Sequence, residues 1–444
     1  MPRMEWSRLI SDKRFGLEDH PVRPLNRTDF QRDYDRLVFS APFRRLQNKT
    51  QVFPLPGRIF VHNRLTHSLE VSCIGRSLGT EVGRSVMERD KALKADHADF
   101  GAIVSAACLA HDMGNPPFGH SGERAITAYF NEGRGMRWEA QVREEGSRWE
   151  DFSKFEGNAN AFRLLTHAFQ GRRAGGFVLT YSTLASIVKY PYTSLERYPK
   201  LGFFETEESS YVRIAEELGI PRLSSEGEPL RYARHPLVYL VEAADDICYQ
   251  IMDLEDAFKL KIISFEEILS LFLSFFPPER HDRLLKHFER VTDTNERVAY
   301  LRSAVIGALV EGCVRSFLRH EEEILNGIRL APLVSLTDSP MAEAYKACEA
   351  TAYERIYRTK YVVDIEFAGF RTFEQLLDSL IEAQLKPGNA FSKLWYSRIP
   401  EQYELGRDSL YGKIQTALDY VSGMTDVYAL EVYRKLTGMS LPEV

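Results

Sequence analysis

Thiols are scarce in this chain, and their arrangement excludes two common kinds of structural support. The 444 residues contain five cysteines, an odd number, and no two of them form a CxxC pair. A disulfide framework and a zinc ribbon both need paired cysteines, so we expect neither. Reduced thiols are typical of a cytoplasmic protein.

Long apolar runs are also lacking. The longest, from Ile268 to Phe276, is interrupted by serines and is well short of the ~20 residues that span a bilayer. The first fifteen residues carry charges throughout and contain no apolar signal core. The sequence therefore predicts a soluble, cytoplasmic protein without a membrane association.

Positive charge is not in excess either. The chain has 57 Lys and Arg against 63 Asp and Glu, a formal net charge of −6, which argues against a protein that wraps duplex DNA through its overall charge. A local basic groove for a single strand is still compatible with this balance. With 44% hydrophobic and 27% charged residues, the composition is that of a globular protein and excludes a disordered or collagen-like chain.

Alternating strand patterns are scarce, whereas apolar residues at helical spacing recur from Asp29 onward. The exception is 51–62, where two prolines and a glycine break short β-favouring runs into a hairpin or loop. We therefore predict an all-α fold with at most one short hairpin, comprising a core over residues 1–264 and a helical C-terminal portion over 265–444. The segments 130–157 and 205–234 lack a clear period, and we interpret them as excursions outside the core.

The polar pair His111-Asp112 stands out because it follows an apolar stretch. Residues 103–110 are apolar almost all round, which predicts a buried helix, and Gly114 with the next two prolines ends it. Leaving two ionisable side chains unpaired in an interior costs several kcal/mol. A metal ion is one partner that would satisfy both.

Other candidate ligands lie on other predicted helices: His67 on one, and the acidic pair Asp245-Asp246 on another. Two histidines and two aspartates suit a divalent ion such as Mn, Fe, Co, Ni, Mg or Zn, with positions left open for water and a phosphate oxygen. The alternatives are a satisfied histidine at position 67 and a solvent-exposed acidic face, because Asp245, Tyr249 and Asp253 lie opposite an apolar stripe. Spacing alone leaves both interpretations open.

Several segments together resemble the HD-domain metal-dependent phosphohydrolases and, more narrowly, the deoxyguanosine triphosphate triphosphohydrolases. In chain order they are FRRLQNKTQVFP (43–54), NRLTHSLEV (63–71), HDMGNPPFGHSGERAI (111–126), FEGNAN (155–160), VEAADDICYQIMDLEDA (241–257) and YVSGMTD (420–426). The resemblance implies an all-α enzyme that hydrolyses a deoxynucleoside triphosphate to the deoxynucleoside and inorganic triphosphate.

The metal ligands implied by the resemblance are His67, His111, Asp112 and Asp245. Its register favours Asp245 over Asp246, because the family's ligand is followed four residues later by a tyrosine and eight residues later by an aspartate. Helical geometry alone does not separate the two neighbouring carboxylates.

His120 and Glu123 are three residues apart, a spacing that lets a carboxylate orient an imidazole on one side of a helical first turn. The resemblance makes His120 the catalytic acid or base near the phosphate and Glu123 its partner. The alternative is an ordinary helix N-terminus in which Ser121 is the cap and Glu123 favours the helix dipole.

The substrate-binding residues implied by the resemblance come from separate segments. Arg64 shares the helix face of His67 and suits bidentate phosphate binding, and Lys189 resembles a triphosphate-binding lysine. Tyr249 would exclude a 2′ hydroxyl by packing against C2′ of the sugar, while Asp253 and Gln51 would accept from the 3′ hydroxyl. Glu366 is conceivable near the base, with an ordinary helical position as its alternative.

The resemblance also bears on partners. It implies a homo-oligomer, plausibly a hexamer, and allows for a nucleotide activator and for single-stranded DNA as partners, but it leaves the preferred base and the resident metal undetermined. Two other functions stay open: an HD-type nucleotidase or cyclic-nucleotide phosphodiesterase, and a nucleic-acid-binding regulatory protein that uses the HD shell as a scaffold.

Overall fold

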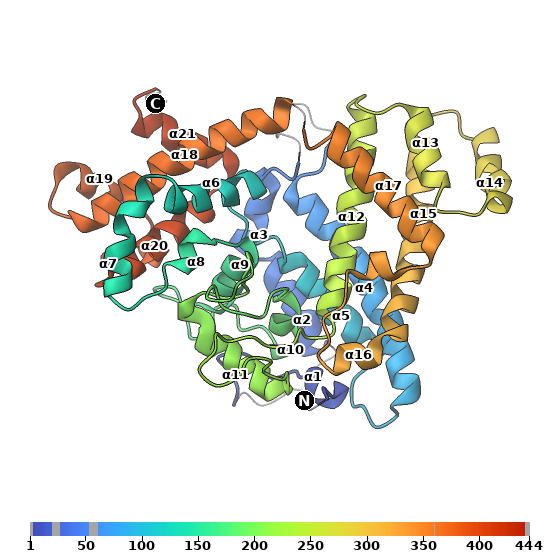
Figure 1. Ribbon diagram of the computed structural model, residues 1–444, viewed down its shortest axis with the longest axis horizontal. Coiled ribbons are helices and arrows are strands. Elements are labelled where there is room, and N and C mark those ends of the chain that lie inside the picture. The colour runs from blue at the N-terminus through green and yellow to red at the C-terminus, as the bar shows by residue number, and fades with distance from the viewer. Residues whose placement is uncertain (1–2, 20–26, 53–60, 359, 440–444) are drawn as a thin grey trace.

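The computed structural model describes residues 3–19, 27–52, 61–358 and 360–439, and these are mainly helical (Figure 1). Helix accounts for 66% of the chain and strand for 2%, and the described residues form isolated bridges but no sheet. The all-α prediction is confirmed. The predicted hairpin falls mostly on residues 53–60, outside the described residues; its flanks Thr50 and Asn63 form one antiparallel bridge.

The N-terminal half contains short helices and two long ones. They are α1 (Trp6–Leu9), α2 (Asp29–Val38), α3 (Ala41–Arg45), η1 (Leu46–Asn48), α4 (Arg64–Arg89), α5 (His97–Ala110), α6 (His120–Asn131), η2 (Arg134–Trp138), α7 (Glu139–Glu144), α8 (Glu150–Ser153), α9 (Gly157–Thr166), α10 (Tyr181–Ile187), η3 (Glu205–Glu207) and α11 (Glu208–Leu218).

The C-terminal half has three more long helices, α12, α15 and α18. In order, its elements are α12 (Val238–Lys259), α13 (Phe265–Leu273), α14 (Pro278–Leu285), η4 (Lys286–Glu289), α15 (Thr294–Arg319), α16 (Glu321–Leu325), η5 (Leu333–Leu336), α17 (Ser339–Arg355), α18 (Lys360–Leu385), α19 (Ala390–Arg398), η6 (Glu401–Tyr403), α20 (Leu410–Ser422) and α21 (Asp426–Leu436).

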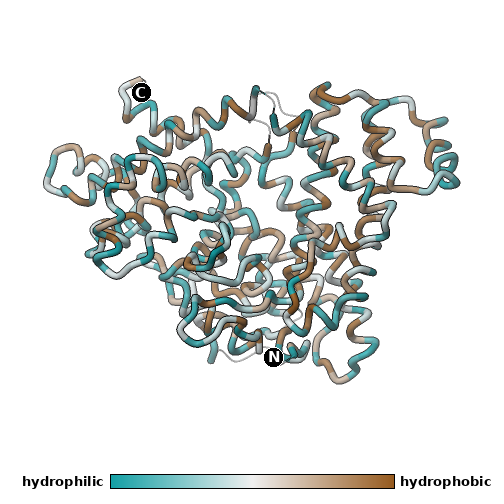
Figure 2. Tube along the Cα trace, viewed as in Figure 1, coloured by the Kyte–Doolittle hydropathy of each residue, from teal (hydrophilic) through white to brown (hydrophobic). Residues whose placement is uncertain are grey.

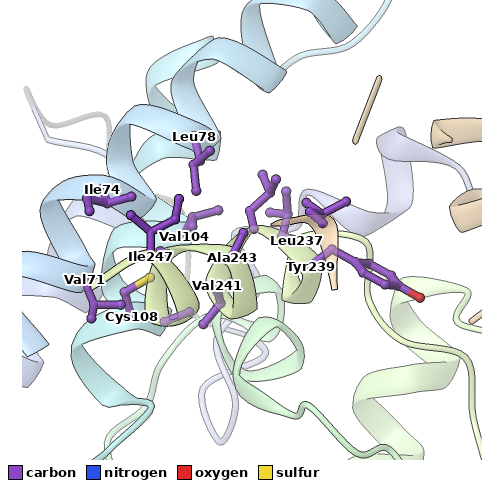
Figure 3. Packing of buried hydrophobic residues seen from close by; sticks show 14 of the residues in the cluster. Val71, Ile74, Leu78, Val104, Cys108, Leu237, Tyr239, Val241, Ala243 and Ile247 are labelled. Atoms are coloured by element: carbon purple, nitrogen blue, oxygen red, sulfur yellow. The ribbon is translucent and has the colours of Figure 1, made fainter. Parts of the chain in front are cut away.

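Helices α4, α5 and α12 form the centre of the first hydrophobic core (Figure 3). Side chains from all three helices gather there, among them Val71, Ile74, Leu78, Val104, Cys108, Ala243 and Ile247. Helix α5 is buried on nearly all sides, as the apolar stretch before His111 predicted. The three helices therefore bring their ends, and the polar residues on them, close together.

A second hydrophobic core joins α6–α8 to α18–α21, which lie beside each other at the left of Figure 1. Trp138, Val142, Trp149 and Phe152 are buried in it, so interpreting 130–157 as an excursion was wrong. The helices within 130–157, which are η2, α7 and α8, are each only one or two turns long. They are too short for a helical period to appear in the sequence.

The interpretation of 205–234 as an excursion outside the core was also wrong. This segment contains α11, and Tyr211, Ile214 and Leu218 on that helix are buried in the first core. Helices α13–α17 also supply residues to the first core, and α18–α21 to the second. The division at residue 264 stays a prediction.

Hydrophobic and hydrophilic residues alternate along most helices (Figure 2), as expected where one face is buried. Within the described ranges, every helix is too short or too polar to serve as a membrane span.

Candidate metal centre and substrate cleft

The first turn of α4 positions Arg64 and His67. Asn63 caps the helix by accepting from the Thr66 amide, and the Thr66 hydroxyl accepts from the Asn63 amide in return. Arg64 and His67 are three residues apart on one face, and each is only 2% exposed. Both side chains therefore point into the protein.

His111 lies directly after the last turn of α5, and its ring is oriented by the backbone. Its Nδ1 lies 2.6 Å from the Cys108 carbonyl oxygen and donates to it, so in the neutral ring the lone pair is on Nε2. That Nε2 is buried and has no hydrogen-bond partner among the described residues. A buried nitrogen with a free lone pair is suited to a metal ion.

Helix α12 supplies the carboxylate that meets both imidazoles. Asp245 Oδ1 lies 3.1 Å from His67 Nε2 and 3.5 Å from His111 Nε2. One ligand atom from each of the three residues lies within 4.8 Å of the others. Asp245, and not its neighbour Asp246, belongs to this group, whose two nitrogens and one carboxylate fit a divalent cation.

Asp112 lies at the edge of this group. Its Oδ2 accepts from Arg64 Nη1 at 2.6 Å, and its Oδ1 accepts from Asn115 Nδ2 at 2.5 Å while lying 3.6 Å from His111 Nε2. Burial raises the pKa of Asp112, but the Arg64 and His111 charges outweigh it and lower the pKa to about 2. Asp112 is therefore a carboxylate already shared between an arginine and the histidine pair.

The charges of this cluster depend on one another. Burial lowers the pKa of His111, yet the carboxylates of Asp112 and Asp245 raise it to about 9. Burial likewise raises the pKa of Asp245, and the His111 charge brings it well below its usual value. A divalent cation would replace the histidine proton as the partner of these carboxylates.

His120 and Glu123 begin α6 and form a pair. His120 Nδ1 lies 2.9 Å from Glu123 Oε2, and Glu123 Oε1 accepts from the Gly157 amide at 2.8 Å. The hydrogen bond to Glu123 raises the pKa of His120. The His120 side chain is 59% exposed, whereas that of Glu123 is 10% exposed. The buried carboxylate of Glu123 therefore orients an imidazole that is accessible to solvent.

The cap of α6 is not Ser121, as the alternative interpretation had it, but Gly119, with no side-chain cap. Gly119 has φ +58°, and a Cβ there would lie 2.2 Å from Arg64 Nη2. Only glycine fits both this conformation and the arginine. The start of α6 is thus packed directly against the arginine that holds Asp112.

A cleft with a cavity volume of about 160 Å³ opens beside the cluster. Its walls include the predicted residues Gln51, Arg64, His111, Asp112, His120, Glu123, Lys189, Asp245 and Tyr249, and also Asn115, Glu156, Tyr190, Lys200 and Glu242, which were not among the predicted site residues. Lys189 Nζ lies 3.2 Å from Glu242 Oε1, and Lys200 pairs with Glu156. The cleft therefore combines three cations with an acid–base pair.

Periodicity wrongly favoured solvent exposure for the acidic face of α12. Asp253 is 4% exposed, and burial raises its pKa to about 8. The hydroxyl of Tyr357 donates to Asp253 Oδ2 at 2.7 Å, and the Tyr357 ring stacks on Tyr249 with centroids 5.8 Å apart. No sequence pattern singled out Tyr357, because only the packing of the segment after α17 brings it to α12.

Three sequence-based candidates are not among the residues that line the cleft. His67 is one of them, although it lies beside Asp245, which does line the cleft. Asp253 is not among the residues that line it, although Tyr249, one turn before, is. Glu366 on α18 pairs with Arg124 and lines a separate surface groove between α6 and α18.

Comparisons with known proteins show which family the chain is similar to. The model of the HD domain matches residues 64–189, and that of the phosphohydrolase-associated domain matches 336–435. A deoxyguanosinetriphosphate triphosphohydrolase-like protein of Synechocystis is 39% identical over 99% of this chain and 100% of its own length. One of Pseudomonas aeruginosa is 37% identical over 99% and 100%. A deoxyguanosinetriphosphate triphosphohydrolase of Yersinia enterocolitica is 30% identical over 92% and 93%. The chain thus belongs to the deoxyguanosinetriphosphate triphosphohydrolase family of HD-domain phosphohydrolases.

Proposed function

We propose that this enzyme hydrolyses deoxynucleoside triphosphates, dGTP or several of them, to the deoxynucleoside and inorganic triphosphate, and that it needs a divalent metal ion. The observation that carries the proposal is the convergence of His67, His111 and Asp245, of which His111 and Asp245 line a cleft whose walls also include Arg64, Lys189 and Lys200. The names of the relatives support the same substrate class.

The metal would be held by His67, His111 and Asp245, with Asp112 as the fourth ligand. When bound, it would polarise the α-phosphate and lower the pKa of a bound water toward about 7. The cluster fits that role because the Cys108 carbonyl holds His111 with Nε2 free and both histidines face one carboxylate.

The triphosphate would be bound by Arg64, Lys189 and Lys200, which line the same cleft. Arg64 is fixed by Asp112 and Lys189 by Glu242, so both cations are ordered before a substrate arrives. Moving three to four phosphate charges out of water needs such prearranged cations.

Proton transfer would be carried out by His120, with Glu123 as its orienting partner. Glu123 is held on its other oxygen by the Gly157 amide, so the imidazole has one preferred orientation. His120 would protonate the leaving 5′ oxygen from the solvent side of the cleft.

The deoxyribose would contact Tyr249 and Gln51, which line the cleft, and Asp253 behind them. A ring packed against C2′ leaves no space for a ribose hydroxyl. The base preference, the nucleotide activator, the single-stranded DNA partner and the homo-oligomer stay predictions.

The test is to incubate the purified chain with each dNTP and with GTP, adding Mg or Mn, and to separate the products by ion-exchange chromatography. We expect deoxynucleoside and tripolyphosphate from dNTPs, and no turnover after treatment with a chelator. Orthophosphate in place of tripolyphosphate would instead indicate a different HD-type hydrolase.

Substitutions of the proposed metal ligands test whether turnover depends on them. Asp112→Ala and His111→Ala should abolish turnover and lower the bound metal measured by mass spectrometry. His97→Ala, which removes a half-buried histidine at the start of the same helix α5, far from the cleft lining, should leave both unchanged. Wild-type turnover in Asp112→Ala would contradict the ligand assignment.

A further inference from the structure

A second pocket lies behind the loop that carries Asp112, and it shares no lining residue with the substrate cleft. It is small, with a cavity volume of about 30 Å³, and its walls include Arg45, Lys49, Arg172, Tyr403 and Ser422. Arg45 and Lys49 come from the segment 43–54, and Ser422 comes from 420–426. Both segments are among those that resemble the family. Apart from Gln51, however, none of their residues has a role in the proposed reaction.

Lys49 is the most buried cation of this pocket, at 2% exposure. Its Nζ donates to the carbonyl oxygens of Asn115 and Ser422 at 2.5 and 2.8 Å. An ammonium has three donors, so one N–H has no partner among the described residues. Burial, followed by the charge of Arg45, lowers the pKa of Lys49 to about 7, as expected for a cation without enough negative charge beside it.

Two guanidinium groups add to this positive charge. Neither Arg45 nor Arg172 forms an ion pair within the described part of the chain, and Arg172 lies over the rings of Phe169 and Phe177 instead. Burial, and then the charge of Arg172, lowers the pKa of Arg45 while Tyr403 opposes them.

The pocket wall has one carboxylate, and it is already engaged. Asp419 accepts from Arg163 at both oxygens, each at 2.7 Å. The hydroxyl of Ser422 is also buried, in a residue 2% exposed, and has no hydrogen-bond partner among the described residues. Arg45, Lys49, Arg172 and the Ser422 hydroxyl therefore share one pocket whose single wall carboxylate is engaged by Arg163.

We propose that this pocket binds a small oxyanion of the phosphate class through Arg45, Arg172 and the Ser422 hydroxyl, with Lys49 at its base. Guanidinium groups match the geometry of phosphate oxygens, and a buried hydroxyl gains most from a charged acceptor. The narrowness of the pocket suits a phosphate group rather than a nucleoside.

The position of the site connects it to the metal cluster. Lys49 donates to the Asn115 carbonyl, and the Asn115 side chain donates to Asp112. A bound oxyanion would neutralise the positive charge directly behind the loop on which Asp112 lies.

The experiment is a calorimetric titration of the full-length protein with sodium phosphate, at an ionic strength held constant with sodium chloride. The variants are Arg45→Met and Arg172→Met, which keep an apolar stem of similar length. The matched controls are Arg44→Met and Arg173→Met, which remove the exposed arginine next to each. We expect at least tenfold weaker phosphate binding in the first pair and less than a twofold change in the second.

Lys189→Met separates this pocket from the substrate cleft. It should leave phosphate affinity unchanged; a loss confined to Lys189→Met, or equal affinity in all four arginine variants, would overturn the proposal. Failure of the wild type to bind phosphate, tripolyphosphate or dAMP would also overturn it. Because the substrate cleft is itself proposed to bind a triphosphate, binding is assigned to the pocket only where Arg45→Met and Arg172→Met weaken it and Lys189→Met does not. Binding of phosphate that meets this condition indicates a free anion as the source, and such binding of dAMP or tripolyphosphate alone indicates a phosphate group of a larger molecule.

Folding of the variants is checked by circular dichroism and thermal melting in chloride. Arg172 is exposed, so its replacement should not unfold the chain, and Ser422→Ala gives a third, smaller change that should also weaken binding. None of these measurements uses turnover, so the proposed reaction and the proposed oxyanion site are tested independently.

Discussion

At the scale of single residues, the site depends on what holds each side chain. His111 is a suitable ligand because the Cys108 carbonyl takes its Nδ1 proton, and Asp112 stays charged because Arg64 and His111 outweigh its burial. These partners, more than the residue types, decide which atoms are free to react.

His120→Ala tests the proton-transfer role. The imidazole is exposed while its partner Glu123 is fixed by the Gly157 amide, so its loss should remove proton transfer and leave the metal ligands in place. We expect kcat to fall by about 10²–10⁴-fold, with the metal content unchanged by mass spectrometry. Glu123→Gln should give a smaller loss, and a change in KM alone would argue for a binding role instead.

Tyr249→Ala tests the exclusion of ribonucleotides. The Tyr249 ring stacks on Tyr357 and lines the cleft, so its removal should open space beside the sugar. The ratio of kcat/KM for GTP to that for dGTP should rise by about tenfold, the effect of a modest steric contact. Tyr249→Phe keeps the ring and should keep the ratio low. Equal ratios in wild type and Tyr249→Ala would place the sugar elsewhere.

At the scale of elements, His67 and His111 can lie close together only if α4 and α5 pack closely. A Cβ at Gly79 would lie 2.7 Å from the Phe100 carbonyl oxygen, and one at Gly75 would lie 2.5 Å from Cys108 Sγ. Glycine at these helix positions therefore reflects close backbone approach. The same crossing brings His67 and His111 within 5.5 Å, measured between ring centroids.

Gly79→Ala should force these two helices apart. The clash is with backbone, which cannot rotate away, so we expect the free energy of unfolding to fall by about 1–3 kcal/mol. Gly307→Ala is the matched control, because a Cβ at that exposed position of α15 meets nothing within 4 Å. It should stabilise the protein by about 1 kcal/mol. Urea unfolding of both variants measures the difference, and two changes of the same sign would contradict the packing argument.

At the scale of the whole molecule, a few buried polar residues connect distant parts of the chain. Asp426 at the start of α21 accepts from the Thr50 amide and hydroxyl and from the Phe118 amide. His235 connects the segment before α12 to the N-terminus, because its Nε2 donates to the Leu9 carbonyl and its Nδ1 accepts from the Leu237 amide.

His235 should make folding stability depend on pH. Burial lowers its pKa from the ordinary 6.5 to about 4, so below pH 6.5 the unfolded chain takes up a proton that the folded chain does not accept until near pH 4. Stability is therefore lost as the pH falls through this window, by about 2 kcal/mol from this group between pH 7 and 5.

Unfolding in urea at pH 7 and pH 5 measures this loss. His235→Gln is the control, because glutamine can hydrogen-bond but does not titrate; it should lose about 2 kcal/mol less than the wild type over the same interval. Equal losses in the two proteins would show that another group is responsible.

The sequence by itself determined the helical class and the buried helix before His111, because both follow from local periodicity. It also singled out His111 and Asp112 as polar residues placed where no solvent is expected. Its resemblance to a family pointed to Asp245 in place of Asp246, and Asp245 is the carboxylate that lies beside His67 and His111.

Only the tertiary structure decided how remote segments meet. Periodicity placed the face of Asp253 in solvent because it cannot show that Tyr357, 104 residues later, covers it. The second core joins 118–159 to 373–432, and the helices that 130–157 contributes to it, η2, α7 and α8, are too short to have a readable period. The pocket around Lys49 likewise arises where residues 45–49 meet 422, because side-chain contacts across such separations depend on packing and not on local pattern.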